Sequence, residues 1–295
     1  MSVPSLDVVN TLRQVGTPTS DRIEYTASID PVFTIGPKVH GGTLQMLTAN
    51  AALAGFIATA PGDEAGGGAR QGSEDDKPAS PGLAPVAVAT NFLGAPEPAV
   101  ITLQVWVRKR GRRVSLVDVE VHQNGRNLVH STVTLGTPDT QSHYSAPSSL
   151  TELPAEPGDD VVYIEDSPMG EIMHLGAVLD IAIDEKSIAF ARGQKGDPVF
   201  RMWVRPKTTT PDGLFAVLAG DLSAPVVMNL GLFGWAPTMQ LTTYLRRNPA
   251  PGWLRLEASS TEVGHGWFEQ DHVVIDSTGN VVVQSRQLAL IPAAN

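Results

Sequence analysis

The feature of this sequence that most constrains its fold is an internal repeat. Residues 84–93, APVAVATNFL, resemble residues 236–245, APTMQLTTYL, and the two stretches are offset by 152 positions. A turn that ends in glycine follows in each half, at Gly125 and at Gly279, with an offset of 154. Because a chain of 295 residues is also too long for most single cores, we expect two similar units.

Each repeat has the pattern of one buried helix followed by antiparallel strands. Residues 40–58, HGGTLQMLTANAALAGFIA, are apolar on nearly all sides, and residues 211–228, PDGLFAVLAGDLSAPVVM, are similar. Both open at a glycine after a polar or proline-containing turn, which is typical of a helix start. Stretches such as HVVIDSTGNVVVQSRQLAL alternate and are rich in β-branched residues, which indicates antiparallel strands.

A sheet that wraps around one buried helix is the hotdog architecture, so the repeat predicts an α+β double hotdog. We expect two antiparallel sheets, each wrapped around a long buried helix. The N-terminal hotdog should cover residues 1–137, with a flexible loop at 59–82 that is rich in glycine, proline and charge. A linker at 138–160 should lead to the C-terminal hotdog at 161–295, which carries the catalytic residues.

Composition excludes several kinds of chemistry. There are no cysteines, which removes disulfides, thiol nucleophiles and thiolate metal sites. The seven histidines show no H-E-x-x-H or paired i, i+4 spacing, so we expect no metal and no other cofactor. The net charge of −10 argues against a nucleic-acid partner. No signal pattern and no apolar run of membrane-spanning length are present, so we expect a cytoplasmic protein without membrane insertion.

Several stretches, taken in order, resemble the TesB-type acyl-CoA thioesterases (acyl-CoA thioesterase II), which are double hotdogs. They are FTIGPKVHGGTLQML, VWVRKRGRRVSLVDVEVHQNGR, AGDLSAP, PTMQLTTYLR and QSRQLAL. The resemblance covers residues 33–136 and 197–292 and implies hydrolysis of an acyl-CoA substrate to free acid and CoA. It also implies a water held by an Asp, a Ser or Thr and a Gln, which match Asp221, Thr238 and Gln287.

The repeat provides an internal control for these three residues. At the matching positions the first half has only uncharged residues, namely Asn50, Val86 and Val133. The polar triplet is therefore not a requirement of the fold. Each member also has a purely structural explanation. Asp221 could accept bonds from backbone N–H groups, Thr238 could be an ordinary strand residue, and Gln287 could be a core amide.

The absence of other motifs leaves a defined chemistry for this site. No G-x-S-x-G motif is present, and without cysteine an acyl-enzyme route has little support. We expect Asp221, desolvated in its apolar segment, to act as general base toward the water. The backbone N–H of Gly42, at the start of the other helix, is the candidate for stabilising the oxyanion, and His40 should border the site.

A basic stretch at residues 108–113, RKRGRR, is a further candidate for contact with the substrate. Arg110 and Arg112 within it are the residues expected to contact the CoA phosphates. The alternative is that the stretch is simply the solvated end of a β-hairpin.

Three other functions remain open. One is a non-catalytic double hotdog that binds acyl-CoA or lipid, and another is a purely structural subunit. The third is a hotdog enoyl-thioester hydratase, which resembles families with an Asp–His pair or a catalytic His on the hotdog helix. The segment around Asp221 has no histidine, which counts against it. Because strand edges in hotdogs are normally paired, we expect a homodimer or a larger homo-oligomer.

Overall fold

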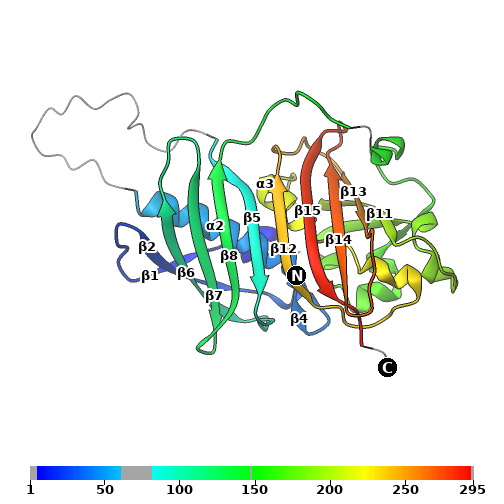
Figure 1. Ribbon diagram of the computed structural model, residues 1–295, viewed down its shortest axis with the longest axis horizontal. Helices are drawn as coiled ribbons and strands as arrows, with labels where there is room; N and C mark the ends of the chain where they lie inside the picture. Colours follow the sequence, from blue (N-terminus) through cyan, green and yellow to red (C-terminus); the bar gives the residue numbers. More distant parts are fainter. Residues whose placement is uncertain (1–4, 61–81, 147, 294–295) are drawn as a thin grey trace, which may run out of the picture.

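The structure is a computed structural model of the chain, and it describes residues 5–60, 82–146 and 148–293. Most of the loop predicted at 59–82 lies outside the described residues. Among these residues, thirteen strands form one continuous sheet, which corrects the prediction of two separate sheets. The half-sheets join edge to edge where β5 (Ala84–Phe92) pairs antiparallel with β12 (Thr238–Leu245). Figure 1 shows this sheet with helices α2 and α3 behind the same face.

The two half-sheets repeat the same strand order outward from the junction. After β5, the first half continues with β8 (Arg126–Gly136), β7 (Ser115–Gln123), β6 (Val100–Lys109), β2 (Arg22–Ser28) and β1 (Arg13–Val15). After β12, the second half continues with β15 (Val281–Leu290), β14 (Trp267–Ile275), β13 (Leu254–Ser259), β11 (Val199–Pro206), β10 (Leu179–Asp184) and β9 (Val161–Tyr163).

Short elements complete the described chain. A separate two-stranded sheet is formed by β3 (Thr34–Ile35) and β4 (Lys38–Val39), and the first helix is α1 (Leu6–Val9). The 3-10 helices are η1 (Pro31–Phe33), η2 (Ser149–Glu152), η3 (Ile164–Asp166), η4 (Pro168–Glu171), η5 (His174–Ala177), η6 (Glu185–Ser187), η7 (Ala189–Arg192) and η8 (Val226–Leu230).

Helix α2 (Gly41–Ala58) is the helix expected at residues 40–58, and it packs across the inner face of the first half-sheet. His40 caps its N-terminus by accepting a hydrogen bond from the N–H of Thr43. The helix is apolar on nearly all sides because the sheet covers one side and α3 contacts another. No helix in the described ranges is long and apolar enough to cross a membrane.

The second helix is much shorter than the sequence predicts. Helix α3 (Gly213–Ala219) ends at Gly220, and the chain coils again only in η8. Gly220 and Pro225 explain the break, because glycine is a poor helix former and the residue before a proline avoids helical geometry. Asp221 therefore lies in the turn after α3 and not on the helix.

Strand pairing shows which residues of the two halves are equivalent. In β5 the register shifts at Val86 before Val88 pairs with Val133. In β12 the register shifts at Met239 before Leu241 pairs with Gln287. The two bulges match, so Val133 is the counterpart of Gln287, as the repeat predicts.

The other two counterparts need correction. Thr238 precedes the bulge in β12, so its counterpart is Pro85, which precedes the bulge in β5, and not Val86. Both candidates are apolar, so the first half still has no polar side chain there. Asn50 lies inside α2 and donates to the carbonyl of Asn10, whereas Asp221 lies beyond the end of α3. These two residues do not occupy equivalent places.

One buried amide clamps the junction between the two half-sheets. Gln45 of α2 is fully buried beneath β5 and β12. Its Nε2 lies 3.2 Å from the carbonyl oxygen of Val88 and 3.1 Å from Oγ1 of Thr90 on β5. The same nitrogen lies 3.0 Å from the carbonyl oxygen of Leu241 on β12. Its Oε1 accepts a hydrogen bond of 2.6 Å from Thr243, so one side chain bonds to both halves.

Replacing Gln45 by leucine should loosen this junction. Leucine is similar in size but leaves the hydroxyl of Thr243 buried without its acceptor, so the free energy of unfolding should fall by about 2 kcal/mol. Urea denaturation measures this change. The matched control is Gln104→Leu, since the amide of Gln104 is half-buried and, among the described residues, its side chain bonds to Glu24 alone. The control should change the unfolding free energy by less than about 0.5 kcal/mol. Equal effects of the two substitutions would contradict the clamp.

Candidate active site

The carboxylate of Asp221 faces the N-terminus of α2, which belongs to the other half of the chain. Its Oδ2 lies 3.6 Å from Nε2 of His40, and the N–H of Gly42 donates a hydrogen bond to the carboxylate. The side chain of Asp221 is only 10% exposed. The sequence around this acid shows no partner because His40 lies 181 positions earlier in the chain.

Both ring nitrogens of His40 are engaged. Nδ1 lies 3.2 Å from the backbone nitrogen of Thr43 and accepts its N–H, so Nε2 carries the proton. Nε2 then donates to the backbone carbonyl of Asp221 at 2.9 Å. We assign this tautomer from the hydrogen-bond pattern. His40 therefore fixes both the start of α2 and the turn that carries the acid.

Two glycines allow the helix and the acid to come this close. A Cβ at Gly41 would stand 2.7 Å from Oδ2 of Asp221. A Cβ at Gly42 would stand 2.6 Å from the carbonyl oxygen of Leu218 and 3.0 Å from Cβ of Asp221. Side chains at either position would displace the turn, so the glycine pair is required by its contact with Asp221.

Burial raises the pKa of Asp221 above the usual range of a carboxyl group, because desolvation disfavours the charged form. His40 and the hydrogen bond from Gly42 oppose this effect and lower the pKa by smaller amounts. The N-terminal end of α2 also carries partial positive charge, which favours an anion. Asp221 can therefore ionise, yet it takes up a proton more readily than an exposed aspartate does.

Thr238 and Gln287 form a direct pair on neighbouring strands. The hydroxyl of Thr238 donates to Oε1 of Gln287. This bond orients the amide, and its N–H groups have no hydrogen-bond partner in the part of the chain that the structure describes. Gln287 is only 6% exposed. Its amide N–H groups are therefore donors available to a bound molecule in a nearly buried position.

The Thr238–Gln287 pair and the acid lie in the same neighbourhood. Gly220, which precedes Asp221, accepts a hydrogen bond from the hydroxyl of Ser285 on β15. Gln287 is two residues further along the same inner face of β15, at about 7 Å along the strand. Within the described ranges, no hydrogen bond joins Asp221 to either member of the pair. The acid and the pair are thus linked through β15, which bonds to the residue before Asp221 and carries Gln287.

The sequence analysis did not identify a buried polar cluster that contacts the turn containing Asp221 from β14 and β15. It consists of Ser223, Gln270, His272 and Ser285. The available signal was in β14, where two inward positions that alternate with outward charged ones are polar. In a half-buried strand such inward positions are normally apolar.

Arg110 and Arg112 lie in the turn between β6 and β7, at the opposite end of α2 from Asp221. The guanidinium of Arg110 donates to the carbonyl of Phe56 at 2.9 Å and to the hydroxyl of Thr59, and it lies 4.3 Å from the centre of the Phe56 ring. Arg110 therefore caps the C-terminus of the helix, about 27 Å from its start. Arg112 is exposed on the same turn.

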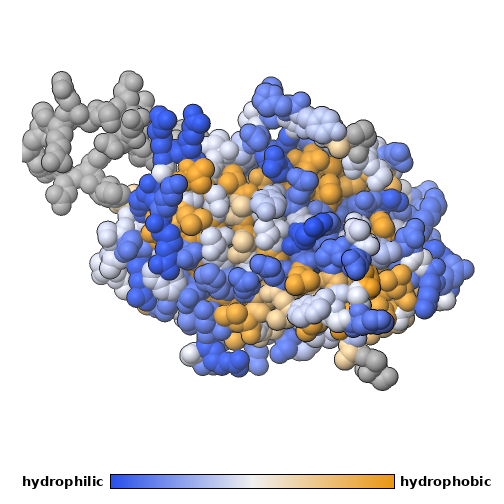
Figure 2. Space-filling model, viewed as in Figure 1, coloured by the Kyte–Doolittle hydropathy of each residue, from blue (hydrophilic) through white to orange (hydrophobic). Residues whose placement is uncertain are grey.

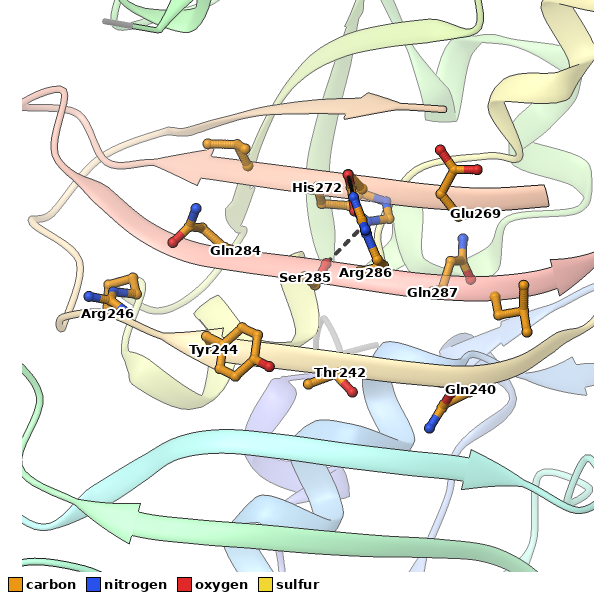
Figure 3. A pocket seen from close by; sticks show the side chains of 13 residues that line it. Gln240, Thr242, Tyr244, Arg246, Glu269, His272, Gln284, Ser285, Arg286 and Gln287 are labelled. Atoms are coloured by element: carbon orange, nitrogen blue, oxygen red, sulfur yellow. Dashed lines mark hydrogen bonds and ion pairs between the residues drawn. The ribbon is translucent and has the colours of Figure 1, made fainter. Parts of the chain in front are cut away.

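A hollow of about 760 Å³ lies over β12, β14 and β15, and Asp221 does not line it. Figure 3 shows polar side chains around it, including Gln240, Thr242, Tyr244, Gln284 and Arg286. The outer surface of the sheet in Figure 2 is largely hydrophilic, with separate apolar patches. Gln287 of the predicted triplet also lines this hollow, together with His272 and Ser285, whereas the acid lies outside it.

Family models match both halves of the chain. The acyl-CoA thioesterase N-terminal domain matches residues 29–136, and the acyl-CoA thioesterase C-terminal domain matches residues 147–291. Uncharacterized proteins of Mycobacterium tuberculosis and Mycobacterium bovis are 40% identical over 284 residues, which covers 91% of this chain and 91% of each relative.

Solved structures share the whole fold. A candidate thioesterase II from Thermobifida fusca is 26% identical, with a TM-score of 0.77 over 99% of both chains. A protein of unknown function with a hot dog fold from Alicyclobacillus acidocaldarius is 18% identical, with a TM-score of 0.72 over 98% of both chains. An acyl-CoA thioesterase II, TesB2, from Mycobacterium marinum has a TM-score of 0.62 at 14% identity and covers 98% of both chains. From the two matched domains, which together span most of the chain, this protein belongs to the acyl-CoA thioesterase family.

Proposed function

We propose that this chain hydrolyses an acyl-CoA thioester to a free acid and CoA. The observation that carries the proposal is the buried carboxyl of Asp221, held at the N-terminus of α2 by groups from the other half. An acid whose pKa is raised by burial is suited to accept a proton from water. Membership of the acyl-CoA thioesterase family supports this assignment.

In the proposed reaction, Asp221 removes a proton from a water as the water oxygen attacks the thioester carbonyl. The new C–O bond forms a tetrahedral oxyanion, which collapses as the C–S bond breaks. The protonated Asp221 returns its proton to the leaving thiolate, so the products are the acid and the thiol of CoA. Thr238 and the free amide N–H of Gln287 would orient the water. The step uses no metal and no cofactor.

The oxyanion needs a donor, and the N–H of Gly42 is the proposed one. This N–H donates to ionised Asp221 before the reaction. When Asp221 becomes protonated, that hydrogen bond weakens, and the N–H becomes available to the oxyanion that forms in the same step. His40 would act in this scheme by holding the turn, because both of its ring nitrogens are engaged.

Contact with the CoA phosphates stays a proposal for Arg112, which is exposed on the turn. It is not proposed for Arg110, whose guanidinium bonds to Phe56 and Thr59 at the end of α2. The homodimer or larger assembly also stays a proposal. Both outer strands of the sheet, β1 and β9, have 3 residues each, and such short edges discourage pairing with another sheet. A contact between copies would therefore use another surface.

The position of His40 gives one reason to consider a hotdog enoyl-thioester hydratase. The segment around Asp221 lacks histidine, but the fold brings His40 to 3.6 Å from its carboxylate. A catalytic imidazole needs a nitrogen that can exchange a proton with the substrate. Since Nδ1 accepts from Thr43 and Nε2 donates to the Asp221 carbonyl, hydrolysis is the better-supported chemistry.

Asp221→Asn should lower kcat/KM for acyl-CoA by at least about 100-fold, because the amide cannot accept the proton of the water. Release of free CoA thiol from acyl-CoAs of several chain lengths measures the rate. Asn50→Asp is the control in the first half and should leave the rate within about twofold, since Asn50 lies inside α2 and its amide donates to the carbonyl of Asn10. A fully active Asp221→Asn protein would remove Asp221 from the mechanism. Bound acyl-CoA without turnover in the natural protein would favour the binding-module alternative.

Asp221→Asn should also raise the free energy of unfolding at neutral pH. The pKa of Asp221 is higher in the folded than in the unfolded state, so its contribution to stability is full at low pH and is lost as pH rises through the folded-state pKa. The ionised acid is therefore unfavourable at pH 7. Asp221→Asn should gain about 1 kcal/mol there and nothing below about pH 4. Thermal unfolding at both pH values tests the sign, and a loss at pH 7 would contradict it.

The pH dependence of kcat/KM should show an acidic limb set by Asp221. Only the ionised acid can act as base, so the rate should fall as pH drops through its raised pKa. The midpoint of this limb should lie clearly above the value of about 4 that is usual for aspartate. A limb at or below that value would mean that the base is an exposed carboxyl group.

Gly42→Ala should lower kcat by a larger factor than it lowers the affinity for the substrate. Its Cβ would meet the carbonyl of Leu218 at 2.6 Å, so the turn with Asp221 must move away from α2. A displacement of catalytic groups by about 1 Å costs about 100-fold in rate. Gly125→Ala serves as a control for general strain, because its φ of +73° is unfavourable but no atom lies within 4 Å. The control should be less stable with an unchanged kcat.

A further inference from the structure

His40 holds the turn that contains Asp221 from the side of α2. A buried polar network on the sheet holds the same turn from the side of β14 and β15. Ser223 lies on the turn, Gln270 and His272 on β14, and Ser285 on β15. Their exposed fractions are 9%, 0%, 1% and 5%, in that order. Nothing in the proposed hydrolysis uses these side chains, and a buried polar group that has no role is costly to retain.

The hydrogen bonds fix where each proton in the network lies. The hydroxyl of Ser285 donates to the carbonyl of Gly220, so it can only accept from Nδ1 of His272, which lies 3.1 Å away. His272 is then protonated at Nδ1, and its Nε2 is an acceptor. Nε2 faces the hydroxyl of Ser223 at 2.9 Å and the amide nitrogen of Gln270 at 3.2 Å, and both can donate to it.

The network forms hydrogen bonds with residues that precede and follow Asp221 in the turn. Before the acid, the carbonyl of Gly220 is bound by Ser285. After it, the hydroxyl of Ser223 accepts from Gln270 at 2.7 Å, and Oε1 of Gln270 accepts from the N–H of Val226 at 2.9 Å. The dashed line in Figure 3 marks the Ser285–His272 contact, behind the strands that carry these residues.

In the described residues of the first half, Ser131 bonds instead to Thr90, and no histidine or glutamine stands on the neighbouring strand β7 at the matching positions. Val133 is the counterpart of Gln287, and it pairs with Val117, whereas Gln287 pairs with Gln270. Two residues along, Ser131 pairs with Val119, whereas Ser285 pairs with His272. The positions of Gln270 and His272 are therefore valine in the other hotdog, so the fold does not need polar groups there. The difference coincides with the half that carries Asp221.

We propose that His272 is a positioning residue for Asp221. As a neutral imidazole protonated at Nδ1, it joins Ser285 to Ser223 and so holds the turn that presents the acid to the N-terminus of α2. The proposal rests on the proposed hydrolysis for its kinetic consequences. The geometric claim, that His272 sets the burial of Asp221, is independent of that function.

The charges around His272 favour the neutral form. Burial lowers the pKa of His272 to about 4; Asp271, the next residue on β14, acts to raise it, and His40 from α2 acts to lower it. The carboxylate of Asp271 faces outward and pairs with Arg286. A second proton on His272 would place a hydrogen on Nε2, where it would oppose the donors from Ser223 and Gln270. The network should therefore stay intact through neutral and mildly acidic pH.

The test compares three variants by steady-state kinetics with acyl-CoA and by NMR titration of the Asp221 carboxyl carbon. His272→Phe fills the space but removes the three hydrogen bonds to Ser285, Ser223 and Gln270, and His272→Asn keeps a donor toward Ser285. Val119→Ala is the matched control, since it loosens the equivalent position of the first half without touching the turn. All measurements are made at a temperature where each variant is folded.

We expect His272→Phe to lower kcat about 10- to 100-fold with KM nearly unchanged, and to move the pKa of Asp221 down toward the usual aspartate value as water reaches the turn. His272→Asn should restore part of both quantities, and Val119→Ala should alter neither. A folded His272→Phe protein with the natural kcat and Asp221 pKa would overturn the proposal, as would equal effects in Val119→Ala. If the natural protein has no turnover, the proposed function fails, and the Asp221 titration alone decides the role of His272.

Discussion

The pairing of β5 with β12 is the contact on which the rest of this molecule depends. It turns two half-sheets into one and sets α2 and α3 side by side on the same face. Gln45 reinforces this arrangement by bonding to both strands from below. Only because the halves are joined in this way does the N-terminus of α2 reach the turn after α3. The candidate active site therefore belongs to neither hotdog alone.

Within that frame, opposing electrostatic effects act on one acid. Removal from water raises the pKa of Asp221, while His40 and the N–H of Gly42 stabilise its charge. The balance leaves a group that can ionise and can also accept a proton, which is what a general base needs. The two glycines at the start of α2 make the contact sterically feasible. Stability alone does not call for an acid here, which agrees with the role proposed for Asp221.

The two halves contribute different groups to the proposed site. The first half contributes the start of α2, with His40 and the glycine pair. Valines occupy its strand positions that correspond to Gln270, His272 and Gln287. The second half contributes Asp221, the Thr238–Gln287 pair and, behind the turn, the network around His272. Duplication permits this division, because each half needs the same core but only one set of reactive groups. Val117 and Val133, the counterparts of Gln270 and Gln287 in the first half, show where the second half departs from a simple core.

The sequence by itself determined the repeat, the strands, helix α2 and the half in which the polar residues stand. These features depend on local pattern, which alternation and helix-type burial encode within a few residues. Only the tertiary structure decided that the sheets are one, that α3 stops at Gly220, that Arg110 caps a helix, and that His40 and Asp221 meet. Each of these depends on segments far apart in the chain, and His40 and Asp221 are 181 residues apart. Such pairings are set by the packing of whole elements, so no local pattern around Asp221 could have revealed its partners.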